Sequence, residues 1–543
     1  MQVQGAVKVP QSEQSADRMD SLGSAILDSP AQPSQTQQFR SHVGHISRQS
    51  GVFFAGTVFT AAAGYAFKVY LARVLGAEAL GVYALGMTLI GFLGIFNALG
   101  LPQAAVRFVA SYRASGKVSE LHALLWRGSA MLVLSSAASA IVLLAVGPQV
   151  ATHFYHSPAL VRCLPYFALL TVFAVLSGYY GKVLAGYKDL TRRTVIVNFV
   201  GVPLMMVFSV IFISAGGGLR GYLGGQIVSG VIVLVLLAAG VRRFTPARAR
   251  LSAPNSSKLP SEVWAFSASM LSIGTMEFVI VQVDKITLGH FASARDVGVY
   301  SLAAAVVAFV PLVLHSVNQI FSPIIADLHT RGELVLLQRL FQSLTKWVVG
   351  LTLPLAAVVI VFARPLMRIF GHDFEAGWPV LVIGCAGQLV NCGVGSVGFL
   401  LLMSGNEKLL IRVQAVTTAV MIAGSMLLVP WLGMVGAAIA AASANIVMNV
   451  CNLWQVRRAL NISPYNRSYL SLLVPTIVML ALTALIRTNI FWFRHDWAAI
   501  GCAGMLAYAV FGCMMLAIGL DQDDRMIGGL IWRRLGGALG ITS

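Results

Sequence analysis

Four charged residues lie within long apolar runs of this 543-residue sequence. Lys68 lies in "AGYAFKVYLARVLG", and Asp284 and Lys285 lie side by side in "FVIVQVDKITLGHF". Glu277 precedes Asp284 by seven residues, which places both carboxylates on one face of a helix. Charges inside a membrane are costly, so they bind a substrate or ion, or pair with one another. Ammonium groups suit phosphate, and a buried carboxylate can bind a proton or Na⁺.

The composition places these residues in a polytopic helical membrane protein. Hydrophobic residues make up 57% of the chain and charged residues 11%, with a mean hydropathy of +0.79. A soluble chain of this size needs more charge to cover its surface. Runs close to the ~20 residues that cross a bilayer recur fourteen times. They cover residues 51–72, 80–100, 128–148, 159–181, 194–214, 221–240, 264–289, 297–320, 346–367, 377–402, 410–430, 433–453, 468–486 and 498–519.

The net charge is +18, and the distribution of the basic residues along the chain indicates the membrane topology. With a cytoplasmic amino terminus, twenty-eight Lys and Arg residues fall in the tails and inward loops and eight in the outward loops. This distribution obeys the positive-inside rule and places both termini in the cytoplasm. It predicts contact with anionic lipids and argues against nucleic acid as a partner. The six cysteines show no metal-binding spacing, so we expect no metal.

The sequence repeats itself with a shift close to 217 residues. "AFKVYLARVLGAEALGVYALG" (66–86) aligns with "VDKITLGHFASARDVGVYSLA" (283–303), which pairs Lys68 with Lys285 and places Phe67 opposite Asp284. "GYKDLTRR" (186–193) then aligns with "GNEKLLIR" (405–412), and "GLRG" (218–221) with "GMVG" (433–436). Three matches in order predict a duplication. Each repeat holds six spans, so the two halves are related by an axis along the membrane normal, with a substrate site between them.

The predicted fold is therefore all-α, with about fourteen transmembrane helices in two pseudo-symmetric six-helix lobes plus two C-terminal helices. The expected domains are a disordered cytoplasmic tail (1–49), an N-lobe with spans 1–6 (50–240), a cytoplasmic linker (241–263), a C-lobe with spans 7–12 (264–456), and spans 13 and 14 with a cytoplasmic tail (457–543).

The duplicated segments, together with "LLMSGNEKLLIRVQAV" and "LGMVGAAIA", resemble signatures of the bacterial polysaccharide-export flippases. These flippases belong to the multidrug/oligosaccharidyl-lipid/polysaccharide exporter superfamily, and the resemblance covers about residues 45–460. It implies transfer of a polyprenyl-pyrophosphate-linked oligosaccharide across the bacterial inner membrane by alternating access, for surface polysaccharides such as lipopolysaccharide or exopolysaccharide. It also implies a polysaccharide polymerase and export machinery as partners.

Lys68 and Lys285 are the two basic residues within predicted spans, one in each lobe. Our hypothesis is that they face each other across a cavity and bind the pyrophosphate. The alternative is that both snorkel to the interface, since each lies a few residues from the outer end of its span. Glu277 and Asp284 are candidates for H⁺ or Na⁺ coupling. A salt bridge to a lysine such as Lys68 is the competing interpretation, and we favour it for Asp284.

Further polar residues could contact the glycan or guide the phosphate. Arg107 follows the second span and could guide phosphate in, or act as an ordinary interfacial residue. The others could line the cavity or form interhelical hydrogen bonds: Gln282, Gln319, Gln388, Asn391, Asn445 and Asn449.

The sequence does not favour an enzyme. It contains neither a nucleotide-binding GxxxxGK[ST] motif nor a GxSxG motif, and no cofactor is expected. Two alternative functions within the superfamily stay open, a multidrug or other cation antiporter and a lipid II flippase. The cationic cavity candidates and the two additional spans favour an anionic lipid substrate over a drug.

Overall fold

The structure is a computed structural model that describes residues 35–244, 259–488 and 496–518. These residues belong to two units, 1–56 and 57–543, and each unit is described by itself. In the first unit, the described residues form the beginning of helix α2 (Gln35–Ala98). Residues 1–34 of the expected tail and residues 245–258 of the expected linker lie outside the described part of the chain.

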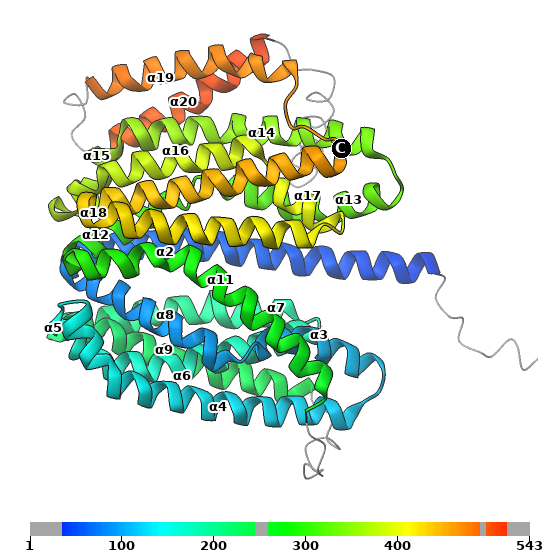
Figure 1. Cartoon of the computed structure of the whole chain (residues 1–543), viewed down its shortest axis with the longest axis vertical. Coiled ribbons are helices and arrows are strands. Elements are labelled where there is room, and N and C mark those ends of the chain that lie inside the picture. Colours follow the sequence, from blue (N-terminus) through cyan, green and yellow to red (C-terminus); the bar gives the residue numbers. More distant parts are fainter. Residues whose placement is uncertain (1–34, 245–258, 489–495, 519–543) are drawn as a thin grey trace, which may run out of the picture. The chain divides into compact units, whose positions relative to one another are not determined.

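All regular elements in these described ranges are helices (Figure 1). After α2 the α-helices are α3 (Leu101–Ala114), α4 (Val118–Gln149), α5 (Pro158–Val161), α6 (Leu164–Gly186), α7 (Leu190–Thr194), α8 (Val202–Phe212), α9 (Gly218–Phe244), α11 (Ser261–Phe291), α12 (Ala294–Val307), α13 (Leu312–Thr330), α14 (Leu334–Val361), α15 (Ala363–Arg368), α16 (Trp378–Val394), α17 (Val397–Met403), α18 (Glu407–Leu460), α19 (Leu473–Thr488) and α20 (Asp496–Ile518). Three π-helical segments are η1 (Val150–Phe154), η2 (Val195–Gly201) and η3 (Ile213–Gly217), and two 3₁₀ segments are η4 (His372–Gly377) and η5 (Arg467–Leu472).

Within the described residues, ten helical segments are long and apolar enough to cross a membrane, or up to eleven if the bent pair Ala294–Val307 and Leu312–Gln319 is one span. Three of the ten are 44, 55 and 54 residues long, whereas one crossing needs about 20. A glycine with positive φ interrupts each of the three, at Gly76, Gly216 and Gly433. Glycine permits such a break, which allows two crossings in one segment. Fourteen spans stay a prediction, and these breaks support it.

The backbone repeats the duplication that the sequence predicts. Gly218 (φ 50°, ψ −133°) and Gly433 (φ 54°, ψ −130°) are aligned positions with the same unusual backbone conformation. Three residues later, a Cβ on Gly221 would lie 2.7 Å from the Phe212 carbonyl oxygen, and one on the aligned Gly436 would lie 2.3 Å from that of Leu428. Both halves therefore make the same tight turn between consecutive long helices.

Three clusters of buried side chains divide residues 57–460 into two lobes. One cluster contains residues of both halves, including Leu85 and Leu288. A second lies around Leu124, among α3, α4, α6, α9 and the start of α11. A third lies around Phe341, among α13, α14, α17 and the end of α18. The lobes therefore share a core at one end, which we call the joined end, and have separate cores at the other, the split end.

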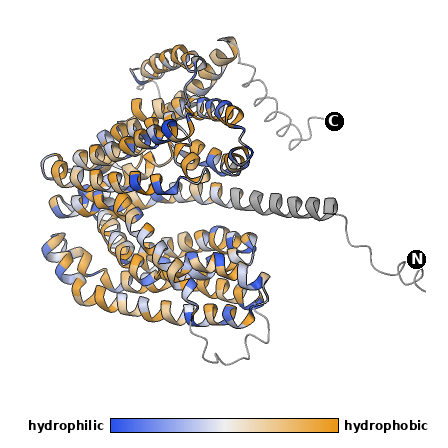
Figure 2. Ribbon diagram, turned by 45° about the vertical axis from the view of Figure 1, so that its right-hand side comes forward, coloured by the Kyte–Doolittle hydropathy of each residue, from blue (hydrophilic) through white to orange (hydrophobic). Residues whose placement is uncertain are grey.

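Figure 1 shows both ends of this arrangement. Helices α5, α12 and α15 lie at the joined end, and α3, α13 and α17 at the split end. Helix α11 runs obliquely between the lobes: Val263 and Phe266 pack with the N-lobe, and α11 also lies against α18 of the C-lobe. Hydrophobic residues predominate along the helices in Figure 2, as expected for faces in contact with lipid. Helices α19 and α20 pack against α14, outside the two lobes.

Candidate functional site

A cavity of about 270 Å³ lies between the two lobes, among α2, α9, α11 and α12. The structure brings three residues predicted from the sequence to its wall, Lys68 of α2 with Gln282 and Lys285 of α11. Both lysines therefore line one cavity from opposite halves of the duplication. The remaining polar side chains of the wall come from Tyr83, Tyr222 and Ser301.

The two ammonium groups differ in their hydrogen bonds. Lys285 Nζ donates to Gln282 Oε1 at 2.9 Å and to the Val281 carbonyl at 3.2 Å, which uses two of its three protons. Lys68 makes no hydrogen bond or ion pair with any described residue. None of the described residues that line the cavity is Asp or Glu. The cavity therefore holds two positive charges and retains free donors for an anion.

Asp284 is buried and makes a different contact from the salt bridge to Lys68 that we favoured from the sequence. Its Oδ2 accepts a hydrogen bond from the Tyr300 hydroxyl at 2.5 Å, and its Oδ1 accepts one from the Lys285 backbone N–H at 2.8 Å. Adjacent helical residues point about 100° apart, so this arrangement turns the carboxylate towards α12 while the Lys285 side chain lines the cavity. Asp284 therefore joins α11 to α12 within the C-lobe.

The hydrogen bond between Asp284 and Tyr300 has no equivalent in the N-lobe, because the aligned residues differ. Tyr83 aligns with Tyr300, but Phe67 occupies the position of Asp284. Without a carboxylate beside it, the Tyr83 hydroxyl lies near the cavity and accepts a hydrogen bond from Gln226 Nε2 at 3.0 Å, and its ring packs on that of Tyr222, with centroids 5.0 Å apart. Tyr83 and Tyr222 were not predicted as site residues, although the repeated Gly-Val-Tyr motif contains Tyr83.

Glu277 lies on the same helix as Lys285, nearer the split end. Glu277 and Val281 lie on an exposed face of α11, whereas Asp284, which its seven-residue spacing placed on the same face as Glu277, is buried against α12. Glu277 has no hydrogen-bond or ion-pair partner among the described residues. An unpaired carboxylate on this face is free to bind a proton or a cation.

Two predicted residues lie away from the cavity. Arg107 of α3 lies at the split end, with its guanidinium 5.0 Å from the ring centroid of Phe266 on α11 and 5.6 Å from that of Phe108. This position agrees with an entrance or an interfacial role. Gln319 is exposed on α13 and does not line the cavity between the lobes.

The amides of α16 and α18 bond mainly to one another. Asn391 Nδ2 donates to Gln388 Oε1 at 3.0 Å within α16. Asn445 Nδ2 donates to the Gly387 carbonyl of α16 at 3.3 Å, and Asn449 Nδ2 donates to the Asn445 side chain at 2.9 Å. Of these three contacts, the one from Asn445 to Gly387 joins two helices, as the interhelical alternative predicts, and the other two lie within one helix. None of the four residues lines the cavity between the lobes.

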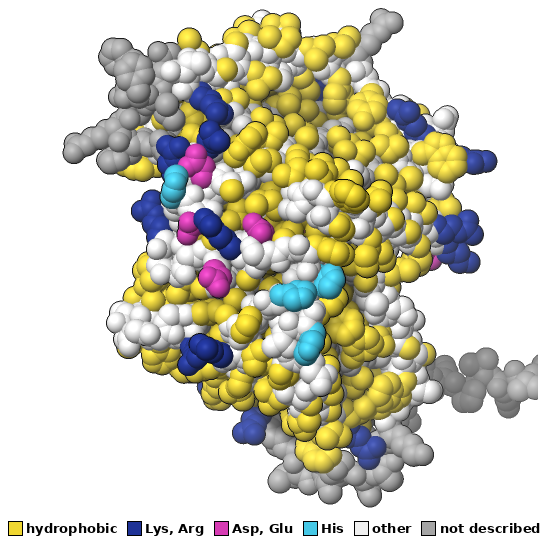
Figure 3. All heavy atoms as spheres, turned by 60° about the vertical axis from the view of Figure 1, so that its left-hand side comes forward, with side chains coloured by type: hydrophobic (Ala, Val, Ile, Leu, Met, Phe, Trp, Pro, Cys, Tyr) yellow, Lys and Arg dark blue, Asp and Glu magenta, His cyan; other side chains and the backbone are white. Residues whose placement is uncertain are grey.

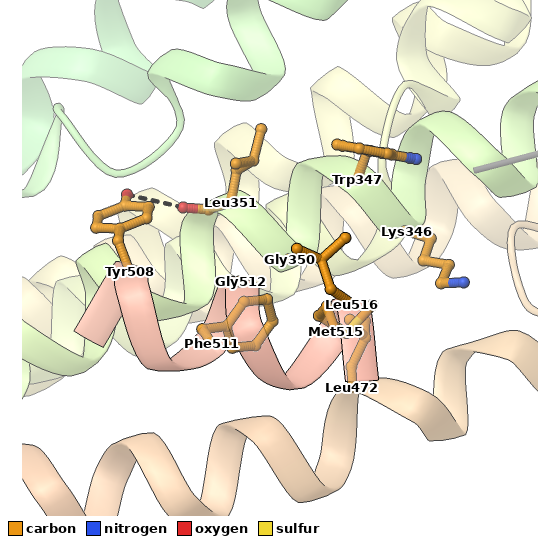
Figure 4. A pocket seen from close by; sticks show the side chains of 10 residues that line it. All are labelled: Lys346, Trp347, Gly350, Leu351, Leu472, Tyr508, Phe511, Gly512, Met515 and Leu516. Carbon is orange, nitrogen blue, oxygen red and sulfur yellow. Dashed lines mark hydrogen bonds between the residues drawn. The ribbon is translucent and has the colours of Figure 1, made fainter. Parts of the chain in front are cut away.

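Two further cavities have largely apolar walls. One of about 380 Å³ lies within the N-lobe and shares Tyr83 and Tyr222 with the cavity between the lobes. The other, of about 250 Å³, lies among α14, α20 and Leu472 (Figure 4). Phe511 and other apolar side chains surround it, and the Tyr508 hydroxyl donates to the Leu351 carbonyl at 2.9 Å. Such walls suit hydrocarbon rather than a glycan.

The fold occurs in known membrane transporters. A lipid II flippase MurJ in an inward closed conformation is 13% identical, with a TM-score of 0.68 over 85% of this chain and 97% of that one. An inward-facing multidrug resistance MATE family transporter of the MOP superfamily is 17% identical, with a TM-score of 0.59 over 74% and 94%. An uncharacterized membrane protein of Methanocaldococcus jannaschii is 20% identical over 410 residues, 72% of this chain and 79% of that protein.

Two family models match parts of the chain. Residues 274–429 match the MatE model. Residues 46–329, just over half of the chain, match the model described as "Polysaccharide biosynthesis protein". The chain therefore belongs to the polysaccharide biosynthesis protein family within the multidrug/oligosaccharidyl-lipid/polysaccharide exporter superfamily, a superfamily of multi-pass membrane transporters and flippases rather than enzymes.

Proposed function

We propose that this protein is a flippase that moves a polyprenyl-pyrophosphate-linked oligosaccharide repeat unit across a bacterial inner membrane, for surface polysaccharide synthesis. One observation carries the proposal: Lys68 and Lys285, related by the duplication, line one cavity between the lobes with no Asp or Glu among its described lining residues. Uncompensated charges in a poorly hydrated site favour a counter-charge. A pyrophosphate supplies that charge and several acceptor oxygens.

The positive charge of the cavity also favours a flippase for an anionic lipid over a multidrug antiporter. A multidrug antiporter that carries cations needs acidic or neutral groups in its cavity, because two lysines repel a cationic drug. A lipid II flippase handles another lipid-linked pyrophosphate, so the same lysines would serve it. Cellular assays distinguish these two substrates.

The positions of basic residues support one orientation of the protein in the membrane. Exposed basic residues such as Lys117, Arg243 and Arg458 lie at the split end. By the positive-inside rule the split end faces the cytoplasm and the joined end faces outward. This orientation is consistent with the cytoplasmic termini that the distribution of basic residues in the sequence predicts. In this orientation the cavity receives the headgroup from the side on which lipid-linked repeat units are made.

Deletion of the gene in its native cell tests the proposal. We expect loss of one surface polysaccharide, with its repeat units accumulating on the polyprenyl carrier at the cytoplasmic face. The wild-type chain should restore both. Unchanged polysaccharide together with increased drug sensitivity would instead support the antiporter, and arrested peptidoglycan synthesis with accumulated lipid II would support the lipid II flippase.

We expect Glu277→Gln to remove the dependence of flipping on a proton or Na⁺ gradient, because the neutral amide takes up no proton and offers Na⁺ no negative charge. The measurement is the flipping rate in proteoliposomes with and without an imposed gradient. Glu407→Gln is the control, since Glu407 is also exposed but lies at the start of α18. A gradient response in Glu277→Gln equal to that of the wild type would remove Glu277 from the coupling step.

A further inference from the structure

Among the residues that the structure describes, two hydrogen bonds cross between the lobes at the joined end. Arg73 Nε on α2 donates to the Ile369 carbonyl beyond α15, at 2.9 Å. His290 Nδ1, in the last turn of α11, donates to the Phe154 carbonyl at 2.8 Å, and the imidazole stacks on the Phe154 ring with centroids 4.4 Å apart. Each bond therefore runs from the end of the first long helix of one lobe to a backbone oxygen of the other.

The duplication relates these two bonds. Arg73 and His290 occupy aligned positions, 217 residues apart like Lys68 and Lys285. The two accepting carbonyls are 215 residues apart, which is the shift of the aligned glycine turns. The side chains differ, but both place an N–H donor at the same position. The contacts are thus reciprocal.

A second reciprocal contact lies beside the first. A Cβ on Gly81 would lie 1.6 Å from the Ala294 carbonyl oxygen, and a Cβ on Gly298 would lie 2.0 Å from that of Ala77. Carbon atoms do not approach an oxygen within 3.0 Å in this way, so only glycine allows the two backbones to meet. Gly81 and Gly298 are aligned positions, and so are Ala77 and Ala294.

These contacts close the cavity between the lobes at one end. Gly298 itself lines that cavity together with Ser301 and Lys68. Figure 3 shows the face of the joined end, where histidine side chains gather together, with basic and acidic side chains on the same face. The buried cluster shared by both lobes also lies here, whereas the cores at the split end are separate. The joined end is thus the closed end of the cavity.

We propose that these four contacts form a two-fold symmetric gate, in which Gly81 and Gly298 set the closest approach of the lobes and Arg73 and His290 hold it. All four contacts join the same two lobes, so moving the lobes apart breaks them together. Each hydrogen bond is individually modest, which makes such a gate reversible. The gate serves alternating access to the cavity whatever the substrate is.

Replacing Gly81 or Gly298 with valine should keep the two lobes apart at the joined end, because the valine side chain would occupy the space of the opposing backbone carbonyl. The test uses purified full-length protein in nanodiscs, with the native cysteines replaced and spin labels at Arg162→Cys and His372→Cys, two exposed positions at the joined end of different lobes. We expect Gly81→Val and Gly298→Val to raise the population at longer label distances on the order of tenfold, which corresponds to about 1.4 kcal/mol. Electron–electron double resonance measures it.

The controls separate the gate from a general folding defect. Gly64→Val changes the same helix where a Cβ meets nothing within 4 Å, and its distance distribution should match the parent. The Arg73→Gln/His290→Gln double variant keeps the glycine contact and should show a smaller rise, so the proposal stays testable if a valine variant fails to fold. Distributions identical to the parent in the folded valine variants and in the double variant would overturn the gate. No substrate is present, so this outcome is independent of the proposed function.

Discussion

The Lys68→Gln/Lys285→Gln double variant should lose nearly all transport, while each single variant keeps part of it. Both lysines line the same cavity, so each single variant still has one positive charge there to bind the pyrophosphate. A charge-assisted hydrogen bond contributes about 1.5–3 kcal/mol, which predicts roughly tenfold to a hundredfold weaker headgroup binding for each lysine removed. The measurement is surface polysaccharide in cells that carry each variant at equal protein level, with flipping in proteoliposomes as the direct rate.

Two further variants show whether charge or mere polarity matters. Lys68→Arg/Lys285→Arg retains both charges and should keep much of the activity. Lys117→Gln/Lys408→Gln removes two charges from exposed positions at the split end and should leave transport close to wild type. Full polysaccharide in the Lys68→Gln/Lys285→Gln variant would contradict the assignment of the cavity as the headgroup site and return both lysines to the snorkelling alternative.

The second large effect concerns stability. We expect Asp284→Ala to destabilise the protein by about 1–3 kcal/mol, because it leaves the buried Tyr300 hydroxyl without its acceptor. Tyr300→Phe should cost a comparable amount, and the double variant less than the sum, with a coupling free energy of about 1–3 kcal/mol. Unfolding of the purified variants in detergent, followed by circular dichroism, measures these values.

Tyr70→Phe is the matched control for loss of a hydroxyl, because Tyr70 stacks on Phe67 and the structure shows no hydrogen bond of its hydroxyl with a described residue. It should leave the unfolding free energy nearly unchanged. The competing role for Asp284, ion coupling, makes the opposite prediction: Asp284→Asn would then keep full stability but abolish the response of transport to a proton or Na⁺ gradient. That result would contradict a structural role within the C-lobe.

The duplicated architecture could be predicted because short segments of the two halves have similar sequences at a nearly constant shift. Glycines at aligned positions, such as Gly218 and Gly433, adopt nearly the same backbone conformation. Lys68 and Lys285 could be placed opposite each other because a two-fold relation between the lobes takes one residue to the other. The apolar runs predicted a membrane protein for the same reason: a bilayer crossing needs a continuous local stretch of apolar residues.

Contacts that break the symmetry could not be predicted in this way. Asp284 bonds to Tyr300 because the C-lobe has a carboxylate where the N-lobe has Phe67, and only the packing of α11 on α12 brings the two groups together. For the amides of α16 and α18, the sequence left both cavity lining and interhelical hydrogen bonding open, with the latter the commoner use, since helical spacing alone does not say which face meets a neighbour. The close approach at Gly81 and Gly298 likewise depends on how the two lobes meet.

Direct binding tests the central claim, that the cavity between the lobes recognises a lipid-linked pyrophosphate through Lys68 and Lys285. The measurement compares the dissociation constants of purified protein for a polyprenyl pyrophosphate and for the neutral polyprenol of the same chain length. We predict that the wild type prefers the pyrophosphate and that Lys68→Gln/Lys285→Gln loses this preference while retaining its affinity for the polyprenol. Equal affinities of the wild type for both lipids, or an unchanged preference in the double variant, would contradict it.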